Sequence, residues 1–152
     1  MEDLAPKARY DALASLFGLN EATVSGVRAS VGLLLPEVSE LVRMFDETIR
    51  SRAATAVLGP VAHEQRETLQ SVLASFIMRT IGCNFDEDYC NYAHEISRGG
   101  SVPRRLFAVG LGTVGDFVAQ TLPGKVEEPE KLVTMLSAWN RLLCVLRELT
   151  RD

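Results

Sequence analysis

The sequence predicts an all-α protein that folds as one domain over residues 1–152. Apolar residues recur three and four positions apart along several stretches, which is the spacing of one face of an α-helix. Alternation of apolar and polar residues never lasts long enough to indicate a strand. Glycine and proline separate the helical stretches, and 47% apolar residues are enough to form a hydrophobic core.

Three helices are predicted in the first third of the chain. The first spans about 6–17 and ends at Gly18, and Asn20 can cap a second helix that continues to about Leu33. Pro36 stands at a first-turn position and opens the third helix. The apolar residues of this third helix fall on one stripe, namely Val38, Leu41, Val42, Phe45 and Ile49.

A long helix and a short one are predicted next. After a break at Gly59-Pro60, the long helix spans about 61–81 and ends at Gly82. Its core-facing residues are Leu69, Val72, Leu73, Phe76 and Ile77. Asp86 can cap the short helix, which runs through Ser97.

Two further helices complete the chain. Gly99-Gly100 end the short helix, and Ser101 and Pro103 start a long one that continues to about Leu122. Its inward residues are Leu106, Val109, Val114, Phe117 and Val118. The last helix starts at Pro129 and runs to the C-terminus.

These two last helices have unusual compositions. Gly110, Gly112 and Gly115 each cost about 1 kcal/mol of helix propensity relative to alanine, and glycine lets a neighbouring backbone or a flat ligand approach closely. The last helix is apolar over more than one face, which exceeds what one contact within the chain buries. We therefore predict a homodimer interface at Leu132, Leu136, Trp139, Leu143 and Leu146. Complete burial within the monomer is the alternative.

Composition and motifs exclude several functions. A net charge of −4 argues against nucleic acid as a partner, since nucleic-acid binding needs a concentrated basic face. No run of eighteen or more apolar residues is present, and the N-terminus has acids where a signal peptide is basic, so we expect a cytoplasmic protein without a membrane partner. No Ser/His/Asp order, phosphate loop or HExxH motif indicates an enzyme.

The three cysteines form no metal-type pair. We interpret Cys83, Cys90 and Cys144 as buried or incidental thiols. A redox pair of Cys83 and Cys90 is the alternative.

Several segments, taken in order, resemble the sensor-globin family, which comprises the protoglobins and the globin domains of globin-coupled sensors. They are LFGL at the end of the first helix, NEATVSGVRASVGLLLPEVSELVRMFDETI, ASFIMRTIG, FDEDY and RGGSVPRRLFAVGL. The resemblance covers roughly residues 10–122 and depends on the order and spacing of these pieces.

The resemblance implies a globin fold with an added N-terminal helix. It also implies a dimer in which the last two long helices of each chain form a four-helix bundle. Family members usually hold haem b and report oxygen or another gas to a kinase, cyclase or chemotaxis module. Because the sequence stops at Asp152, after its last helix, we expect the chain either to signal by contacting a separate protein or not to signal at all.

The position of a haem ligand departs from the family pattern. A globin needs one neutral imidazole directed at its haem iron, with the second ring nitrogen hydrogen-bonded. The family's proximal histidine lies six or seven residues before the proline that opens the next helix, which here gives Ser97 or Ile96, whereas counting from FDEDY points near Gly100. His94 is the nearest histidine, almost one turn before Ser97, and reaches the pocket only if the short helix slides by a turn.

The residues on the opposite wall of the predicted pocket also depart from the family pattern. Sensor globins usually carry Phe-Tyr on the third helix, where the tyrosine donates to bound oxygen, but here the pair is Phe45-Asp46. An ionised carboxylate cannot donate a hydrogen bond, and Asp46 either faces the pocket or faces water. The two departures favour a globin fold without haem. A haem protein with His94 as axial ligand is the alternative.

A globin fold without haem would hold a cavity suited to a small apolar ligand such as an acyl chain. The predicted pocket is lined by Phe45, Asp46, Ile49, Leu73, Phe76, Ile77, His94, Ser97, Leu106, Val109 and Phe117. The alternative is that these side chains pack together. Three functions follow: a haem-free regulatory domain for an apolar ligand or a signalling partner, a haem protein that binds oxygen or another gas, and a dimeric bundle without a ligand.

Overall fold

The computed structural model describes residues 4–99 and 102–151, and within these ranges it contains eight α-helices, two short 3₁₀ segments and no strand. The helices are α1 (Pro6–Phe17), α2 (Glu21–Leu34), α3 (Val38–Arg50), α4 (Arg52–Leu58), α5 (His63–Ile81), α6 (Glu87–Ser97), α7 (Arg104–Thr121) and α8 (Pro129–Leu149). The 3₁₀ segments are η1 (Leu35–Glu37) and η2 (Leu122–Gly124). The all-α prediction is confirmed.

Helix boundaries follow the local signals in the sequence. Gly18 ends α1 in the left-handed conformation, with φ of 69°. The Asn20 side chain accepts from the Thr23 N–H at 3.0 Å, and the Asp86 side chain accepts from the Tyr89 N–H at 2.9 Å. Gly100 and Ser101, where we predicted the end of one helix and the start of the next, lie outside the described residues.

Helix α4 is the one described α-helix that was not predicted from the sequence. Ser51 is extended, with ψ of 154°, so the chain turns between α3 and α4 instead of continuing one helix. The Ser51 hydroxyl oxygen then accepts from the Ala54 N–H at 3.1 Å and caps α4. The helix ends at Gly59, where a break was predicted.

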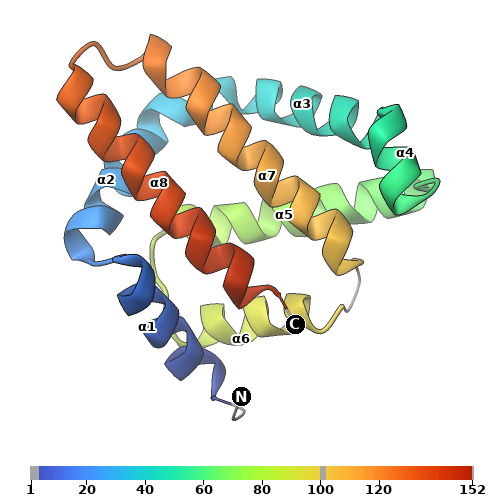
Figure 1. The fold of residues 1–152 in the computed structure, drawn as a ribbon, viewed down its shortest axis with the longest axis horizontal. Helices are drawn as coiled ribbons and strands as arrows, with labels where there is room; N and C mark the ends of the chain where they lie inside the picture. Colours follow the sequence, from blue (N-terminus) through green and yellow to red (C-terminus); the bar gives the residue numbers. More distant parts are fainter. Residues whose placement is uncertain (1–3, 100–101, 152) are drawn as a thin grey trace.

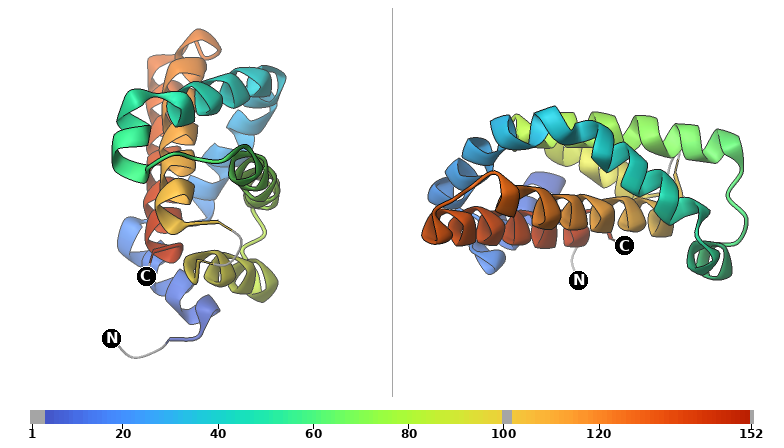
Figure 2. Two further views of the ribbon diagram at one scale, coloured as in Figure 1. Left: turned by 90° about the vertical axis from the view of Figure 1, so that its right-hand side faces the viewer. Right: turned by 90° about the horizontal axis from the view of Figure 1, so that it is seen from above.

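Helix α8 is the centre of the arrangement. It runs antiparallel to α7 at its side, and α1 and α2 pack along it (Figure 1). Helices α3 and α5 pack against α7, and α1 also packs against α6. In the right-hand view of Figure 2, α7 and α8 form one layer and α5 lies in a second layer above it.

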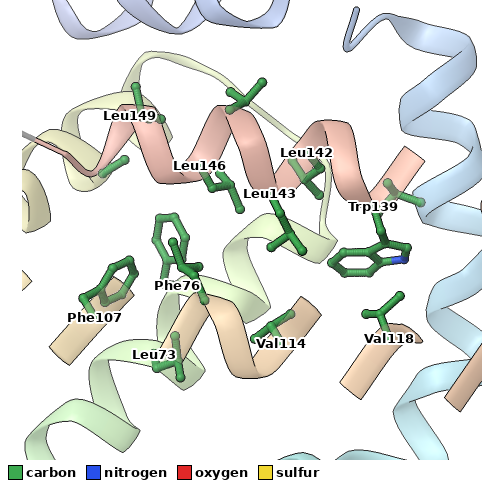
Figure 3. Packing of buried hydrophobic residues seen from close by; sticks show 14 of the residues in the cluster. Leu73, Phe76, Phe107, Val114, Val118, Trp139, Leu142, Leu143, Leu146 and Leu149 are labelled. Carbon is green, nitrogen blue, oxygen red and sulfur yellow. The ribbon is translucent and has the colours of Figure 1, made fainter. Parts of the chain in front are cut away.

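The core lies between α5, α7 and α8. Figure 3 shows Leu146 of α8 above the ring of Phe76, while Leu143 points toward Val114. Phe76 and Leu146 are completely buried. Full burial of side chains of this size supplies about 1.5–3 kcal/mol each, so this layer holds the three helices together.

Helix α7 and the segment after it, Arg104–Gly124, form the one described stretch that is long and apolar enough to cross a membrane, with a mean hydropathy of 1.2. Half of that stretch is buried inside the domain, as in the core helix of a soluble protein.

Two of the glycines in α7 permit close packing. A Cβ atom at Gly110 would lie 2.9 Å from Leu73 Cδ2 of α5, and one at Gly115 would lie 3.3 Å from Leu143 Cδ1 of α8. A Cβ atom at Gly112 would meet nothing within 4 Å. Side chains of the neighbouring helices, and not a ligand, therefore occupy the space at Gly110 and Gly115.

The wide apolar face of α8 is largely covered within the monomer. Trp139, Leu143 and Leu146, which we predicted at a dimer interface, are at most 5% exposed. The reason is that three helices, α1, α2 and α7, pack against α8. The prediction of a dimer interface supposed that α8 packs against only one other helix of the same chain. Leu132 and Leu136 are half-buried, so they belong to the part of the face that remains accessible.

Candidate functional site

Aromatic side chains fill the interior between α5, α6 and α7. The Phe76 ring centroid lies 5.8 Å from that of Tyr89, 6.2 Å from that of Tyr92 and 5.2 Å from that of Phe107, whose ring stands edge-on. Figure 3 shows Phe76 and Phe107 side by side in the core. Such ring pairs add about 0.5–1.5 kcal/mol beyond their buried area. Phe76 is thus part of a packed cluster. This agrees with the alternative in which the predicted pocket residues pack together.

The polar atoms of this cluster have partners. The Thr80 hydroxyl donates to the Phe76 carbonyl oxygen at 2.7 Å and therefore accepts from the Tyr89 hydroxyl, also at 2.7 Å. Burial raises the pKa of Tyr89, so its phenol stays protonated as the donor. Both buried hydroxyl groups therefore have hydrogen-bond partners, as is usual in a protein core.

His94 lies on the flank of α6 that turns away from α5. Tyr92 faces α5, since the Arg79 guanidinium of α5 lies 4.2 Å from its ring centroid. Residues two apart on a helix do not share a face, so His94 does not face α5. It lies one turn after Cys90, which is within electrostatic reach of Lys7 in α1. His94 therefore lies on the side of α6 that carries Cys90 and not on the side that carries Tyr92.

Ser97 and its neighbours offer no axial ligand. The Ser97 hydroxyl is buried and donates to the His94 carbonyl oxygen at 2.6 Å, so it is used within α6. Ile96 is an apolar core residue. Gly100, the other position that the family spacing indicates, lies outside the described residues.

Asp46 faces a polar cleft on the outside of the core. Its carboxylate forms an ion pair with Arg50 at 3.3 Å. The cleft has a volume of about 390 Å³ between α3 and α5 and is lined by Ser39, Val42, Arg43, Asp46, Arg50, His63, Arg66, Glu67 and Gln70. Asp46 therefore faces water and not the predicted pocket.

An apolar hollow lies next to this cleft. It has a volume of about 270 Å³ and is lined by Val38, Leu41, Val42, Phe45, Gln70, Leu73, Ala74, Ile77 and Met78. A smaller hollow of about 60 Å³ shares Val38, Leu41, Ile77 and Met78 with it and reaches Phe117 and Trp139. The two hollows form one continuous surface feature, which we call the α3–α5 groove.

The structure brings together some of the predicted pocket residues. Phe45, Leu73 and Ile77 line the larger hollow and Phe117 lines the smaller one. Leu106 lines a separate hollow of about 450 Å³ between α4 and the start of α7. Ile49 is buried in the core and Val109 is half-buried.

Six lining residues of the larger hollow are missing from the predicted pocket, namely Val38, Leu41, Val42, Gln70, Ala74 and Met78. Val38 and Val42 were assigned to the core stripe of α3, and Met78 was not assigned. All three are exposed, Val42 at 55% and Met78 at 62%. The signal was present, because the apolar stripe of α3 runs over more turns than one neighbouring helix covers.

The amino-acid sequence matches a known family. The protoglobin family model matches residues 7–149, which extends beyond the resemblance noted in the sequence and includes α8. No curated protein and no solved structure matches the chain. The match spans almost the whole chain, and the all-helical fold is the globin-like one expected for that family. The chain therefore belongs to the protoglobin family.

Proposed function

We propose that this protoglobin is a regulatory binding domain that works without haem and holds a small apolar ligand in the α3–α5 groove. The lining of the groove carries the proposal. Of the nine residues around its larger hollow, Gln70 alone is polar, and apolar side chains at its rim are exposed. A concave apolar surface with few polar groups is the usual form of a small-molecule site.

We propose that haem b, the usual cofactor of the family, is not held by the residues that the structure describes. The axial ligand of a globin is an imidazole directed at the iron. His94 is on the flank of α6 opposite to Tyr92, and the Ser97 hydroxyl is bonded within the helix. On the other wall, Asp46 is paired with Arg50 outside the core. These placements support a domain that does not depend on haem.

A ligand in the groove could change the arrangement of the helices that contact it. Its walls are α3 and α5, while its smaller hollow reaches Phe117 of α7 and Trp139 of α8. A ligand that fills the groove would therefore favour one relative position of these four helices. The shift can be no larger than the difference in the ligand's affinity for the two arrangements.

Haemin addition tests the independence from haem. We expect no stoichiometric Soret band in the purified protein after haemin addition, and the same spectrum for His94→Ala. A stoichiometric Soret band that disappears in His94→Ala would establish the haem-binding alternative instead.

A neutral apolar probe tests the groove. Trp139 is the single tryptophan, so its emission reports on the smaller hollow. We expect 1-decanol to change this emission saturably and to bind more tightly than 1-octanol, by about fourfold per methylene. Ala74 is exposed and lines the groove, so Ala74→Phe should block binding, whereas Ser75→Phe on the next position of α5 should not. Equal binding to both variants would place the probe elsewhere.

We also propose a homodimer formed through the outer faces of α7 and α8, which would pass the signal to a separate protein. The support is the accessible surface on these helices. Val133 is 64% exposed, Leu132 and Leu136 are half-buried, and the space around Gly112 is open. Surfaces of small and apolar residues allow two helix pairs to approach closely.

A further inference from the structure

We infer that the ligand of the α3–α5 groove is an anionic amphiphile, a fatty acid whose chain lies in the groove and whose carboxylate is bound by Arg66 in the adjoining polar cleft. This inference rests on the proposed function, because it assigns a chemical class to the ligand of the same groove.

The groove and the polar cleft are continuous. Both lie between α3 and α5, and they share Val42 and Gln70 as lining residues. A molecule that fills the apolar hollow therefore has one end beside the charged cleft. The opposite end points toward the smaller hollow at Trp139.

Both walls change from apolar to charged in the same direction. Helices α3 and α5 run in opposite directions across the fold (Figure 1). Residues four apart lie along one row of a helix. The row on α3 is Val38, Val42, Asp46 and Arg50, and the row on α5, read backward, is Met78, Ala74, Gln70 and Arg66. Because the two rows change from apolar to charged in the same direction, the space between them is apolar in the α3–α5 groove and charged in the polar cleft.

Most charged groups in the cleft already have a partner. These pairs are Arg50 with Asp46 at 3.3 Å, His63 with Glu67 at 3.0 Å, and Arg43 with Glu40 and Glu47. These contacts are made within α3 or within α5, and the one between His63 and Glu67 is an ion pair only when the imidazole is protonated.

Arg66 is the exception. It forms no ion pair with any residue that the structure describes, and its Nε atom is buried without a hydrogen-bond partner. A buried donor without an acceptor is unfavourable in the free protein. A carboxylate supplies two acceptor oxygens in the planar arrangement that matches a guanidinium, whereas an alcohol supplies one weaker acceptor. The chemistry of this site therefore selects an acid as the head group.

Paired probes test the head group separately from the chain. Decanoic acid and 1-decanol, each below its aggregation limit at pH 8, are titrated against the full chain by isothermal calorimetry and by Trp139 emission. We expect decanoic acid to bind at least about tenfold more tightly than 1-decanol, since a hydrogen bond to a charged group has that effect.

Two arginine variants supply the control. Arg66→Gln should reduce the affinity for decanoic acid to that for 1-decanol and leave the affinity for 1-decanol unchanged. Arg52→Gln removes the same charge from an exposed position of α4 outside the cleft and should keep the preference for the acid. Far-UV circular dichroism confirms that both variants are folded, and unaltered binding of 1-decanol to Arg66→Gln confirms an intact groove.

The possible results separate the two proposals. Equal binding of acid and alcohol to the wild type, or a preference for the acid that survives in Arg66→Gln, would overturn the assignment of the head group and leave the groove as an apolar site. Failure of both probes to bind the wild type would overturn the proposed function as well. Sedimentation with phosphatidylglycerol vesicles, without binding of the free acid, would show that the cleft takes a membrane headgroup and would also overturn the assignment.

Discussion

The indole N–H of Trp139 donates to the Ser30 hydroxyl oxygen at 2.7 Å and so joins α8 to α2. Ser30 is fully buried, and its hydroxyl donates in turn to the Val27 carbonyl oxygen at 2.7 Å. Every polar atom of this small network is therefore satisfied, which is the condition under which a buried network fixes the position of its helices. Trp139 is thus a core residue.

Ser30→Ala should lower the free energy of unfolding by about 1–3 kcal/mol, because it leaves the buried indole N–H without an acceptor. Urea unfolding followed by far-UV circular dichroism measures this change. Ser137→Ala, at an exposed position of α8, is the matched control and should change stability by less than about 0.5 kcal/mol. Equal stability of Ser30→Ala and wild type would mean that water or another group replaces the bond.

Alanine substitution at two glycines of α7 should have opposite effects. Gly112→Ala should raise the free energy of unfolding by up to about 1 kcal/mol, since alanine favours the helix and the added methyl group meets no atom. Gly110→Ala should be less stable than Gly112→Ala by about 1–3 kcal/mol, because Leu73 must move out of the way. Urea unfolding of both variants gives the comparison. A Gly110→Ala variant as stable as Gly112→Ala would show that α5 has room to shift.

Helix boundaries could be read from the sequence because their causes are local. Gly18, Asn20 and Asp86 act on residues within one turn, so the printed sequence contains all the information needed. Helix α4 was missed for the opposite reason. Its cap, Ser51, follows α3 directly, and a helix of seven residues shows no apolar stripe.

The candidate site was predicted only in part because helical spacing shows which residues share a face and not what covers that face. Phe45, Leu73 and Ile77 were found by spacing. The exposure of Val42 depends on where α5 lies beside α3, which is a property of the fold. The lack of a partner for Arg66 likewise depends on packing between helices, so no sequence pattern reveals it.

The proposed dimer can be tested without disturbing the monomer. Gly112 in α7 and Gly32 in α2 are both helical, and an added Cβ atom meets nothing within 4 Å at either. Gly112→Leu should shift a dimer to the monomer in size-exclusion chromatography with light scattering, because the larger side chain prevents close approach of the bundle faces. Gly32→Leu should leave the dimer intact. A dimer that tolerates Gly112→Leu would have to use another surface, and a monomeric wild type would exclude the dimer altogether.

Stability should decrease as the pH rises from 9 to 11 because of the buried thiol of Cys90. Burial raises the pKa of Cys90 from 9.0 to about 11. Below pH 9 the thiol is protonated in both states, but between these values the unfolded chain releases its proton while the folded chain keeps it. The unfolded state then binds fewer protons, so the free energy of unfolding falls. From pH 8 to 10.5 under reducing conditions, Cys90→Ala should lose about 1–3 kcal/mol less than the wild type in urea unfolding. Cys144→Ala keeps Cys90 and should follow the wild type. Equal losses in all three proteins would assign the pH dependence to the other groups whose pKa values burial raises, namely Cys83, Tyr10 and Tyr89.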